Sequence, residues 1–166
     1  MKRRAIYAGS FDPITNGHVD IIERGLRMFD EVIVVVATNL RKSTQKSAWF
    51  SVEERVDLVK KVFRHNKRIK VDTCSGLIVE YAREHKVQAL QRGLRAASDF
   101  ESEFMMAAIN REMNHGLETV FMMTGKNLFF ISSTVLKEVA AFGGSIKPYV
   151  HPTVWKSVQE KRKRLR

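Results

Sequence analysis

The alternation of short apolar runs with longer segments of helical periodicity constrains the fold of this chain more than any other feature. Five runs have the length and apolar character of buried strands, and they cover residues 4–8, 32–38, 69–74, 87–92 and 119–124. Between the first two, Val19, Ile22 and Leu26 keep the spacing of one helix face, and other helical segments cover residues 52–65, 77–85 and 98–114. Strands joined by helices become parallel neighbours through right-handed crossovers. We therefore predict an α/β, Rossmann-like fold: a five-stranded parallel sheet with helices on both faces and a C-terminal helix.

Local signals mark where several of these helices begin and end. Ser51 and Ser98 are each followed three residues later by a glutamate, which is the pattern of a capping box at a helix start. After the last helix associated with the sheet, Gly143 and Gly144 supply the residue type that favours a helix end.

The formal net charge of +11 raises the possibility of a basic nucleic-acid-binding module. Much of this charge lies at the two ends of the chain, in residues 2–4 and 156–166. Terminal charge clusters are usually solvated, so the distribution disfavours nucleic acid as a partner. The length of 166 residues suits a single domain. We predict one domain over residues 1–155 and a basic C-terminal tail over residues 156–166.

The apolar runs and the cysteine content favour a cytoplasmic protein. Uninterrupted apolar runs such as residues 32–37 are far shorter than the roughly 20 residues that a membrane-spanning helix needs. The apolar stretch near the N-terminus is too short for a signal peptide. Cys74 is the only cysteine, so it forms no internal disulfide and no CxxC metal site. We expect no association with a membrane.

The first strand-to-helix connection, residues 9–18, contains the first candidate anion site. Gly9 and Gly17 permit close approach of the backbone, and His18 stands at the start of the following helix. Free amides and the helix dipole favour an anion there, and an imidazole can donate to a phosphate. The alternative is that His18 caps or packs the helix, but the surrounding Gly-His pattern favours the functional interpretation.

Two further clusters are expected at the same edge of the sheet, where ligands of open α/β sheets bind. Arg92 and Arg95 follow the fourth strand with Gly93 between them, and two guanidinium groups suit phosphate chelation. The Ser-Ser-Thr run at residues 132–134 opens another helix, where hydroxyls and free amides form an anion cradle. A helix cap accounts for only one of these hydroxyls. Three anion-binding elements at one edge predict a polyphosphate substrate.

These segments resemble those of a known enzyme family. Thr15-Asn16-Gly17-His18 matches a T/HxGH element, and residues 131–137 match an ISSTxxR/K element that ends in Lys137. Both elements are typical of the Rossmann-like nucleotidyltransferase superfamily. Within it, the runs YAGSFDPITNGH (7–18), RGLRAASDFE (92–101) and FISST (130–134) are similar to bacterial phosphopantetheine adenylyltransferases. The resemblance is collinear, and it makes residues 1–155 the nucleotidyltransferase domain.

The resemblance implies reversible transfer of an adenylyl group from ATP to 4′-phosphopantetheine, forming dephospho-coenzyme A and pyrophosphate in coenzyme A biosynthesis. Because the acceptor phosphate is already an anion, direct in-line attack needs no covalent intermediate and no strong general base. The implied partners are ATP, 4′-phosphopantetheine, dephospho-coenzyme A, coenzyme A as product or inhibitor, and further copies of the chain in a homohexamer. Mg²⁺ is expected mainly on the ATP phosphates, with no residue assigned as a metal ligand.

Carried over position by position, the resemblance assigns a role to each expected site residue. The expected catalytic residues are His18, Lys42 and Arg95, with His18 stabilising the transition state. The expected ATP contacts are Ser10, Phe11, His18, Gly93, Leu94, Arg95, Glu103, Leu128, Phe129, Phe130, Ile131, Ser132, Ser133 and Thr134. The expected contacts of 4′-phosphopantetheine are Ser10, Lys42, Ile78 and Arg92.

Some positions depart from the family pattern. The connection after Lys42 is longer than usual, so Arg41 or Lys46 stays open as an alternative to Lys42. Gly76 stands where aspartate is common and Ser102 where tyrosine is common, which bears on acceptor affinity and on feedback by coenzyme A. The alternative functions are adenylyl transfer to nicotinate mononucleotide and a basic nucleic-acid-binding module.

Overall fold

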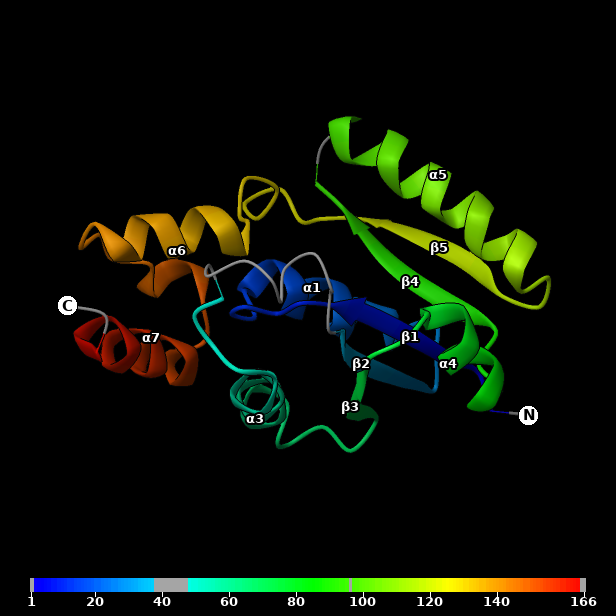
Figure 1. Ribbon diagram of the computed structural model, residues 1–166, viewed down its shortest axis with the longest axis horizontal. Helices are drawn as coiled ribbons and strands as arrows, with labels where there is room; N and C mark the ends of the chain where they lie inside the picture. The colour runs from blue at the N-terminus through cyan, green and yellow to red at the C-terminus, as the bar shows by residue number, and fades with distance from the viewer. Residues whose placement is uncertain (1, 38–47, 96, 165–166) are drawn as a thin grey trace.

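The computed structural model describes residues 2–37, 48–95 and 97–164, and it contains one five-stranded sheet (Figure 1). The strands are β1 (Arg4–Gly9), β2 (Glu31–Ala37), β3 (Ile69–Cys74), β4 (Ala89–Leu94) and β5 (Glu118–Met123). All pairings are parallel, in the order β3-β2-β1-β4-β5. The predicted α/β, Rossmann-like fold is confirmed. The fourth strand begins and ends two residues later than predicted. Gly93 and Leu94 therefore belong to the strand itself.

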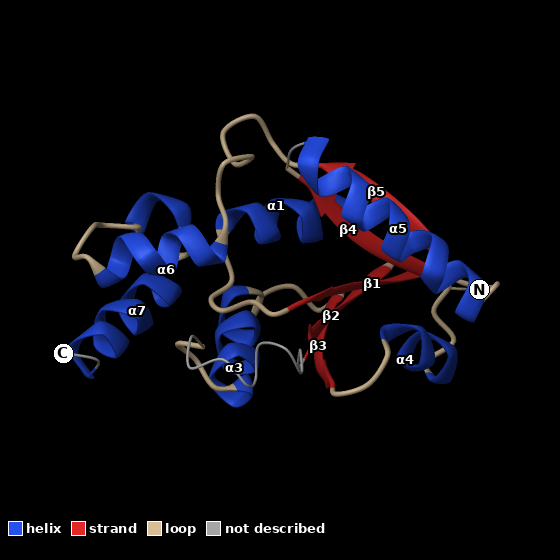
Figure 2. Ribbon diagram, turned by 45° about the horizontal axis from the view of Figure 1, so that its top comes forward, coloured by secondary structure: helices blue, strands red, loops and turns tan. Residues whose placement is uncertain are grey.

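Helices cover both faces of the sheet (Figure 2). α1 (Asn16–Gly25) and α3 (Val52–Val62) pack on one face, and α4 (Ile78–Glu84) and α5 (Ala97–Met113) pack on the other. α6 (Ser133–Ala141), a short 3-10 helix (Lys147–Tyr149) and α7 (Pro152–Arg164) follow β5 and share a hydrophobic cluster with α1 and α3. None of the described helices combines the length and the apolar character that crossing a membrane requires.

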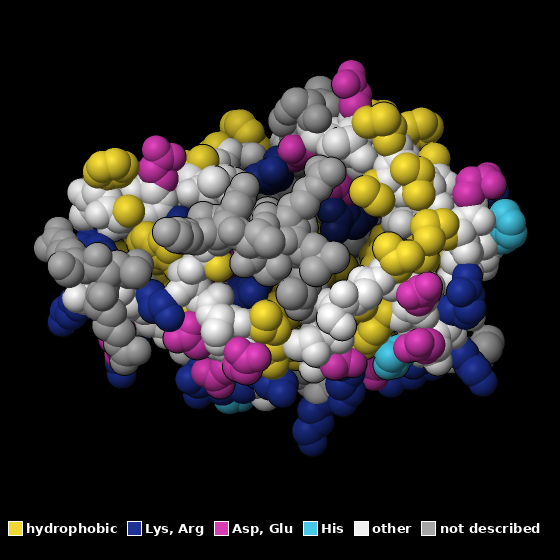
Figure 3. All heavy atoms as spheres, viewed as in Figure 1, with side chains coloured by type: hydrophobic (Ala, Val, Ile, Leu, Met, Phe, Trp, Pro, Cys, Tyr) yellow, Lys and Arg dark blue, Asp and Glu magenta, His cyan; other side chains and the backbone are white. Residues whose placement is uncertain are grey.

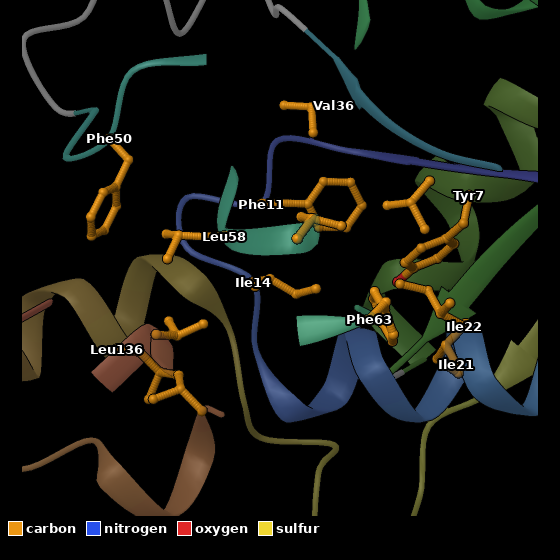
Figure 4. Close-up of a cluster of buried hydrophobic side chains, with 14 of the residues drawn as sticks. Tyr7, Phe11, Ile14, Ile21, Ile22, Val36, Phe50, Leu58, Phe63 and Leu136 are labelled. Carbon is orange, nitrogen blue, oxygen red and sulfur yellow. The ribbon is translucent and has the colours of Figure 1, made fainter. Parts of the chain in front are cut away.

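The hydrophobic core lies on both faces of β2. Val34 points into the larger cluster, which joins α1, α3, α6 and α7, whereas its neighbour Val35 points into the smaller cluster under α4. Figure 4 shows the larger cluster, in which Phe11 and Ile14 from the loop after β1 lie among residues of the surrounding helices. Burial of both faces explains why β2 is continuously apolar instead of alternating.

The helix signals read from the sequence have mixed outcomes. Ser51 and Glu54 form the expected capping box at the start of α3. The second box is wrong, because α5 begins at Ala97 and Ser98 therefore lies inside the helix. There Asp99 reaches back instead, and its carboxylate accepts from the backbone N–H of Arg95 at 3.3 Å. The predicted helix end after α6 is confirmed, because Gly143 follows the last turn with a φ of +94°, as expected for a C-terminal glycine.

The basic C-terminal segment continues a helix that packs on the core. α7 runs through the expected boundary after residue 155, and Val154 and Val158 on it are buried. Lys161 bonds the Glu54 carboxylate of α3 at 2.8 Å and lies over the ring of Phe50. Residues 156–164, the described part of the expected tail, therefore continue the helix that packs on the domain.

The sheet opens at its carboxyl edge between β1 and β4. β1 pairs with β2 from Arg4 to Gly9, but its register with β4 is limited to Ala5 and Ile6. Beyond Ile6 the two strands separate, at the place where the strand order reverses. In open α/β sheets ligands bind at such a switch point. The topology therefore places any cleft beside the ends of β1 and β4.

Candidate active site

A cleft of about 640 Å³ lies at this opening. The cleft lies between two walls, and each wall is built from different helices and loops. The α1–α6 wall comes from the loop after β1 and the starts of both helices, with Phe11, Thr15, Gly17, His18, Ile21, Ile131, Ser132, Ser133 and Thr134. The α4–α5 wall comes from the other face, with Gly76, Ile78, Asp99, Ser102, Glu103 and Met106. Between the walls the floor is formed by Tyr7, Ala8, Gly9, Ser10, Arg92, Gly93 and Arg95.

His18 caps α1 and lines the cleft at the same time. Its Nδ1 accepts a hydrogen bond from the backbone N–H of Thr15 at 3.0 Å, which completes a capping box with the Thr15 side chain. Because Nδ1 is an acceptor, the proton of the neutral ring is on Nε2. Burial, reinforced by the charges of Arg95 and Arg92, lowers the pKa of His18 to about 4. His18 is therefore a neutral ring that offers one N–H to an anion.

The loop after β1 is held in place by its acidic residue, Asp12, and by Arg55 of α3. The buried carboxylate of Asp12 accepts from the backbone N–H of Trp49 and of Phe50, at 3.2 and 3.0 Å. It also forms an ion pair of 2.6 Å with Lys137, the last residue of the ISSTxxK element. From α3, Arg55 donates to the carbonyl of Ser10 at 2.9 Å. These bonds fix the loop against the start of α3 and against α6.

The start of α6 presents backbone amides more than hydroxyls. The Ser132 hydroxyl is the N-cap and accepts from the Val135 N–H, as one hydroxyl of the run was expected to do. The Ser133 hydroxyl donates to the carbonyl of Pro13 at 2.8 Å, which ties α6 to the loop after β1. Thr134 is exposed at the cleft. The first amides of a helix have no partner within it, so those of Ser133 and Thr134 suit an anion.

Arg92 bridges the opening of the sheet. It donates to the carbonyl of Ala8 on β1 at 2.8 Å and makes two bonds to the carboxylate of Glu103 on α5. The hydrogen bonds and charge of Glu103 outweigh burial and raise the pKa of Arg92 further. Three of its five N–H donors are thus used within the protein, and the charge is fixed at the floor of the cleft.

Arg95 connects the two walls. Its side chain is paired with Asp99 of α5 at 3.1 Å, and another nitrogen approaches the carbonyl of Ile131 at 3.4 Å. About 39% of the Arg95 side chain is exposed, compared with 30% of the Arg92 side chain. The cleft thus combines neutral donors on one wall with paired arginines beside the other.

Known proteins are similar to this chain over most of its length. Residues 6–139 match the family model described as cytidylyltransferase-like. A phosphopantetheine adenylyltransferase of Syntrophus aciditrophicus is 48% identical over 97% of this chain and 95% of its own length. Another, from Syntrophotalea carbinolica, is 49% identical over 96% of this chain and 94% of its own length. The chain belongs to the phosphopantetheine adenylyltransferase family.

A solved structure supports the fold alone. The lipopolysaccharide core biosynthesis protein of Thermoplasma volcanium aligns with 76% of this chain and 98% of its own, at a TM-score of 0.56 and 19% identity. The resemblance drawn from the motifs is therefore confirmed at the level of the family, and the Rossmann-like architecture is shared more widely than the family itself.

Most residues that the family resemblance predicts come together in the cleft. Those lining it are Ser10, Phe11, His18, Ile78, Arg92, Gly93, Arg95, Glu103, Ile131, Ser132, Ser133 and Thr134. Four others do not line it: Leu94 is buried in the sheet, and Leu128, Phe129 and Phe130 form a turn before α6. Lys42 and its alternatives Arg41 and Lys46 lie outside the described residues.

Several lining residues were not predicted as site residues, among them Tyr7, Thr15, Ile21, Asp99 and Met106. Tyr7 reads as a strand aromatic, and Ile21 as part of a helix stripe, so their types give no functional signal. Tyr7, Thr15 and Asp99 stand inside the quoted motifs, and that position is the signal that could have identified them. Gly76 and Ser102, the two departures from the family pattern, do line the cleft.

The described carboxylates of the cleft do not form a metal site. Asp99 and Glu103 are each bonded to an arginine, and no group of three or more His, Cys, Asp or Glu side chains in the described segments could hold an ion. Mg²⁺ prefers oxygen ligands and readily takes them from phosphates. These residues therefore do not fit direct ligation of Mg²⁺.

Proposed function

We propose that this chain catalyses reversible adenylyl transfer from ATP to 4′-phosphopantetheine, in line with its family. A phosphate oxygen of 4′-phosphopantetheine attacks the α-phosphorus of ATP, a new P–O bond forms, and the bond to the β-phosphate oxygen breaks. The products are dephospho-coenzyme A and pyrophosphate, and the attack is direct. The anionic acceptor needs no proton removed by a strong base, and the described cleft offers donors and positive charge instead.

The two walls suit the two substrates. The α1–α6 wall contributes the Nε2–H of His18 and the amides at the start of α6, which suit the phosphates of a nucleotide. The α4–α5 wall contributes Ile78 and, at the floor beside it, Arg92, which suit an acceptor with an apolar arm and a phosphate. The α-phosphorus would then lie between them, where charge develops during the transfer.

His18 has the properties that transition-state stabilisation requires. Its tautomer is fixed by Thr15, so its N–H does not have to reorient during the reaction. Because its pKa is about 4, it stays neutral and donates a hydrogen bond without taking part in proton transfer at neutral pH. Arg95 would neutralise charge on the phosphates, and Lys42 would contribute from outside the described residues.

The observation that carries the proposal is the convergence of His18, Arg92, Arg95 and the start of α6 on one cleft. The test is pyrophosphate release from ATP and Mg²⁺ with either 4′-phosphopantetheine or nicotinate mononucleotide as acceptor. We expect release with 4′-phosphopantetheine only. Release with nicotinate mononucleotide instead, or with neither acceptor, would contradict the proposal.

Further properties of the family are proposals for this chain. Mg²⁺ would be carried by the ATP phosphates, coenzyme A would compete at the acceptor side, and the enzyme would act in the cytoplasm. The chain would assemble into a homohexamer, as the family resemblance implies. Self-association is supported by the apolar surface of α5, where Phe104, Met105, Met106 and Ile109 are all more than half exposed. Figure 3 shows hydrophobic side chains gathered over this helix. Sedimentation velocity of the purified chain tests the assembly.

A further inference from the structure

The hydroxyl group of Tyr7 has no part in the activity as described above, although it lies at the floor of the cleft. Tyr7 is the first residue of β1 beyond the register with β4, which ends at Ile6. Its side chain points from β1 toward α1, beside Ile21 and Ile22 (Figure 4). The residue is 7% exposed and lines the cleft.

This hydroxyl has no hydrogen-bond partner within the described part of the chain, nor is it sealed off from the cleft. It lies 3.5 Å from the position that a Cβ atom on Gly93 would occupy, so the absence of a side chain at Gly93 leaves it accessible. A donor in such a position costs free energy unless a ligand or water satisfies it. The equally buried Tyr81 differs, because its hydroxyl donates to Asp72 at 2.7 Å.

The surroundings of the hydroxyl favour an anionic acceptor. Burial raises the pKa of Tyr7 to about 12 against the opposing charges of Arg92 and Arg95, so the group stays protonated and can donate. The rings of Phe11 and His18 lie 5.8 and 6.3 Å from its ring, between centroids. Tyr7 therefore belongs to the same side of the cleft as the His18 N–H.

The side of the sheet on which Tyr7 lies indicates which of the two substrates its hydroxyl would contact. Tyr7 and Phe11 belong to the hydrophobic cluster of α1 and α6, whereas Ile78 packs against the separate cluster under α4. The Tyr7 hydroxyl and the Ile21 side chain both lie next to the position that a Cβ atom on Gly93 would occupy, on the face of β4 opposite to the Arg92–Glu103 pair. The nucleotide is the substrate that the proposed function places on this side.

We propose that the Tyr7 hydroxyl is a further catalytic group, which donates a hydrogen bond to a phosphoryl oxygen of the nucleotide beside the His18 Nε2–H. The proposal rests on the proposed function for the identity of the substrate. Two neutral donors on one side of the cleft would stabilise charge on the phosphoryl oxygens without titrating at neutral pH.

The test compares Tyr7→Phe with Tyr81→Phe as a matched control, since both variants keep the ring and lose one hydroxyl. Steady-state kinetics with ATP and with 4′-phosphopantetheine, and the rise in thermal midpoint caused by MgATP alone, are measured for each. We expect Tyr7→Phe to lower kcat/KM for ATP about tenfold or more, the scale of one hydrogen bond to a charged acceptor. The KM for 4′-phosphopantetheine should stay within about twofold of wild type.

The stability readout separates a substrate contact from a structural role. Without ligand, Tyr7→Phe should melt no lower than wild type, because the lost hydroxyl has no partner in the described chain, and MgATP should raise its midpoint less. Tyr81→Phe should melt lower and keep wild-type turnover.

Two results would overturn the proposal. One is a change of less than about fivefold in the kcat/KM of Tyr7→Phe for ATP, with an unchanged MgATP shift. The other is a fall in the ligand-free midpoint of Tyr7→Phe that matches the fall in Tyr81→Phe. Wild-type protein that releases no pyrophosphate would contradict the proposed function, and the MgATP shift would still decide the role of Tyr7.

Discussion

The two walls of the cleft place hydrogen-bond donors toward a polyphosphate in different ways. On the α1–α6 wall the donors are neutral: an imidazole with a fixed tautomer and the amides of a helix start. Beside the α4–α5 wall the donors are arginines, each held by a carboxylate of α5. The neutral donors are oriented by caps at two helix starts, Thr15 with His18 and Ser132 with Val135. Arg95 and Asp99 are also close in sequence, whereas the Arg92–Glu103 pair joins β4 to α5. The first wall is held together by long-range bonds such as the Asp12–Lys137 pair, and the second depends on docking of α5 against β4.

The largest expected effect tests how the α1–α6 wall is held. Lys137→Met should lower the free energy of unfolding by about 3–5 kcal/mol, because it leaves the carboxylate of Asp12 buried without its cation. Urea denaturation measures the change. Lys61→Met is the matched control, since its pair with Asp57 is more than half exposed and should contribute no more than about 1 kcal/mol. Similar losses in both variants would mean that the Asp12–Lys137 pair does not hold the wall.

Removing the neutral donor should affect turnover more than binding. We expect His18→Ala to lower kcat by about 10²-fold or more while ATP binding is largely kept, because the bond strengthens as charge develops on the phosphoryl oxygens. Pyrophosphate release and calorimetric titration with ATP measure the two quantities. His115→Ala, at an exposed position, serves as control. Turnover of the His18 variant within about threefold of wild type would remove this residue from the transition state.

Removing the bridging arginine should affect one substrate more than the other. Arg92→Ala is expected to weaken 4′-phosphopantetheine about tenfold, and ATP by less, because its guanidinium lies next to Glu103 and the α4–α5 wall. Calorimetry with each substrate checks this difference. Arg111→Ala is the control, since its pair with Glu118 is exposed. Equal weakening of both substrates would show that the walls do not divide the substrates between them.

The smallest expected effect on activity concerns pH. With a pKa of about 4, His18 stays neutral down to mildly acidic pH, so turnover between about pH 5.5 and 8 should not change through its titration. The effect of pH on stability has one direction. The His18 ring titrates near 6.5 in the unfolded chain, so its contribution to the free energy of unfolding is fully present above that pH and is lost as the pH falls toward 4. Thermal midpoints of wild type and His18→Asn across this range measure it. An equally steep fall in both proteins would contradict the lowered pKa.

Local patterns were enough to predict the architecture and the edge that carries the cleft. Apolar runs of strand length and the 3.6-residue period are properties of neighbouring residues, and parallel crossovers then bring all strand ends to one edge. The family resemblance added further lining residues, including Glu103 and Ile78, whose types alone carry no signal. It also added Leu128, Phe129 and Phe130, which the structure does not place in the cleft.

Other expectations depended on partners far away in the chain. The hydroxyls of the Ser-Ser-Thr run suggested an anion cradle, but the Ser133 hydroxyl is bonded to Pro13, a residue that no helix pattern connects with it. A strand aromatic such as Tyr7 looks like any core residue until the separation of β1 from β4 exposes its hydroxyl. The sequence likewise did not predict that α7 packs on α3. The structure shows it through the burial of Val158 and the ion pair of Lys161 with Glu54.

The sequence by itself thus determined the order and type of the elements, the edge where chemistry occurs and the family, because each depends on residues close in the chain or on contiguous motifs. The tertiary structure decided which of the expected groups are free to act. Asp12 with Lys137, Arg92 with Glu103 and Ser133 with Pro13 are paired inside the protein, across separations in sequence that no local pattern records. A hydrogen bond needs contact within about 3 Å, and only folding brings such distant groups to that distance.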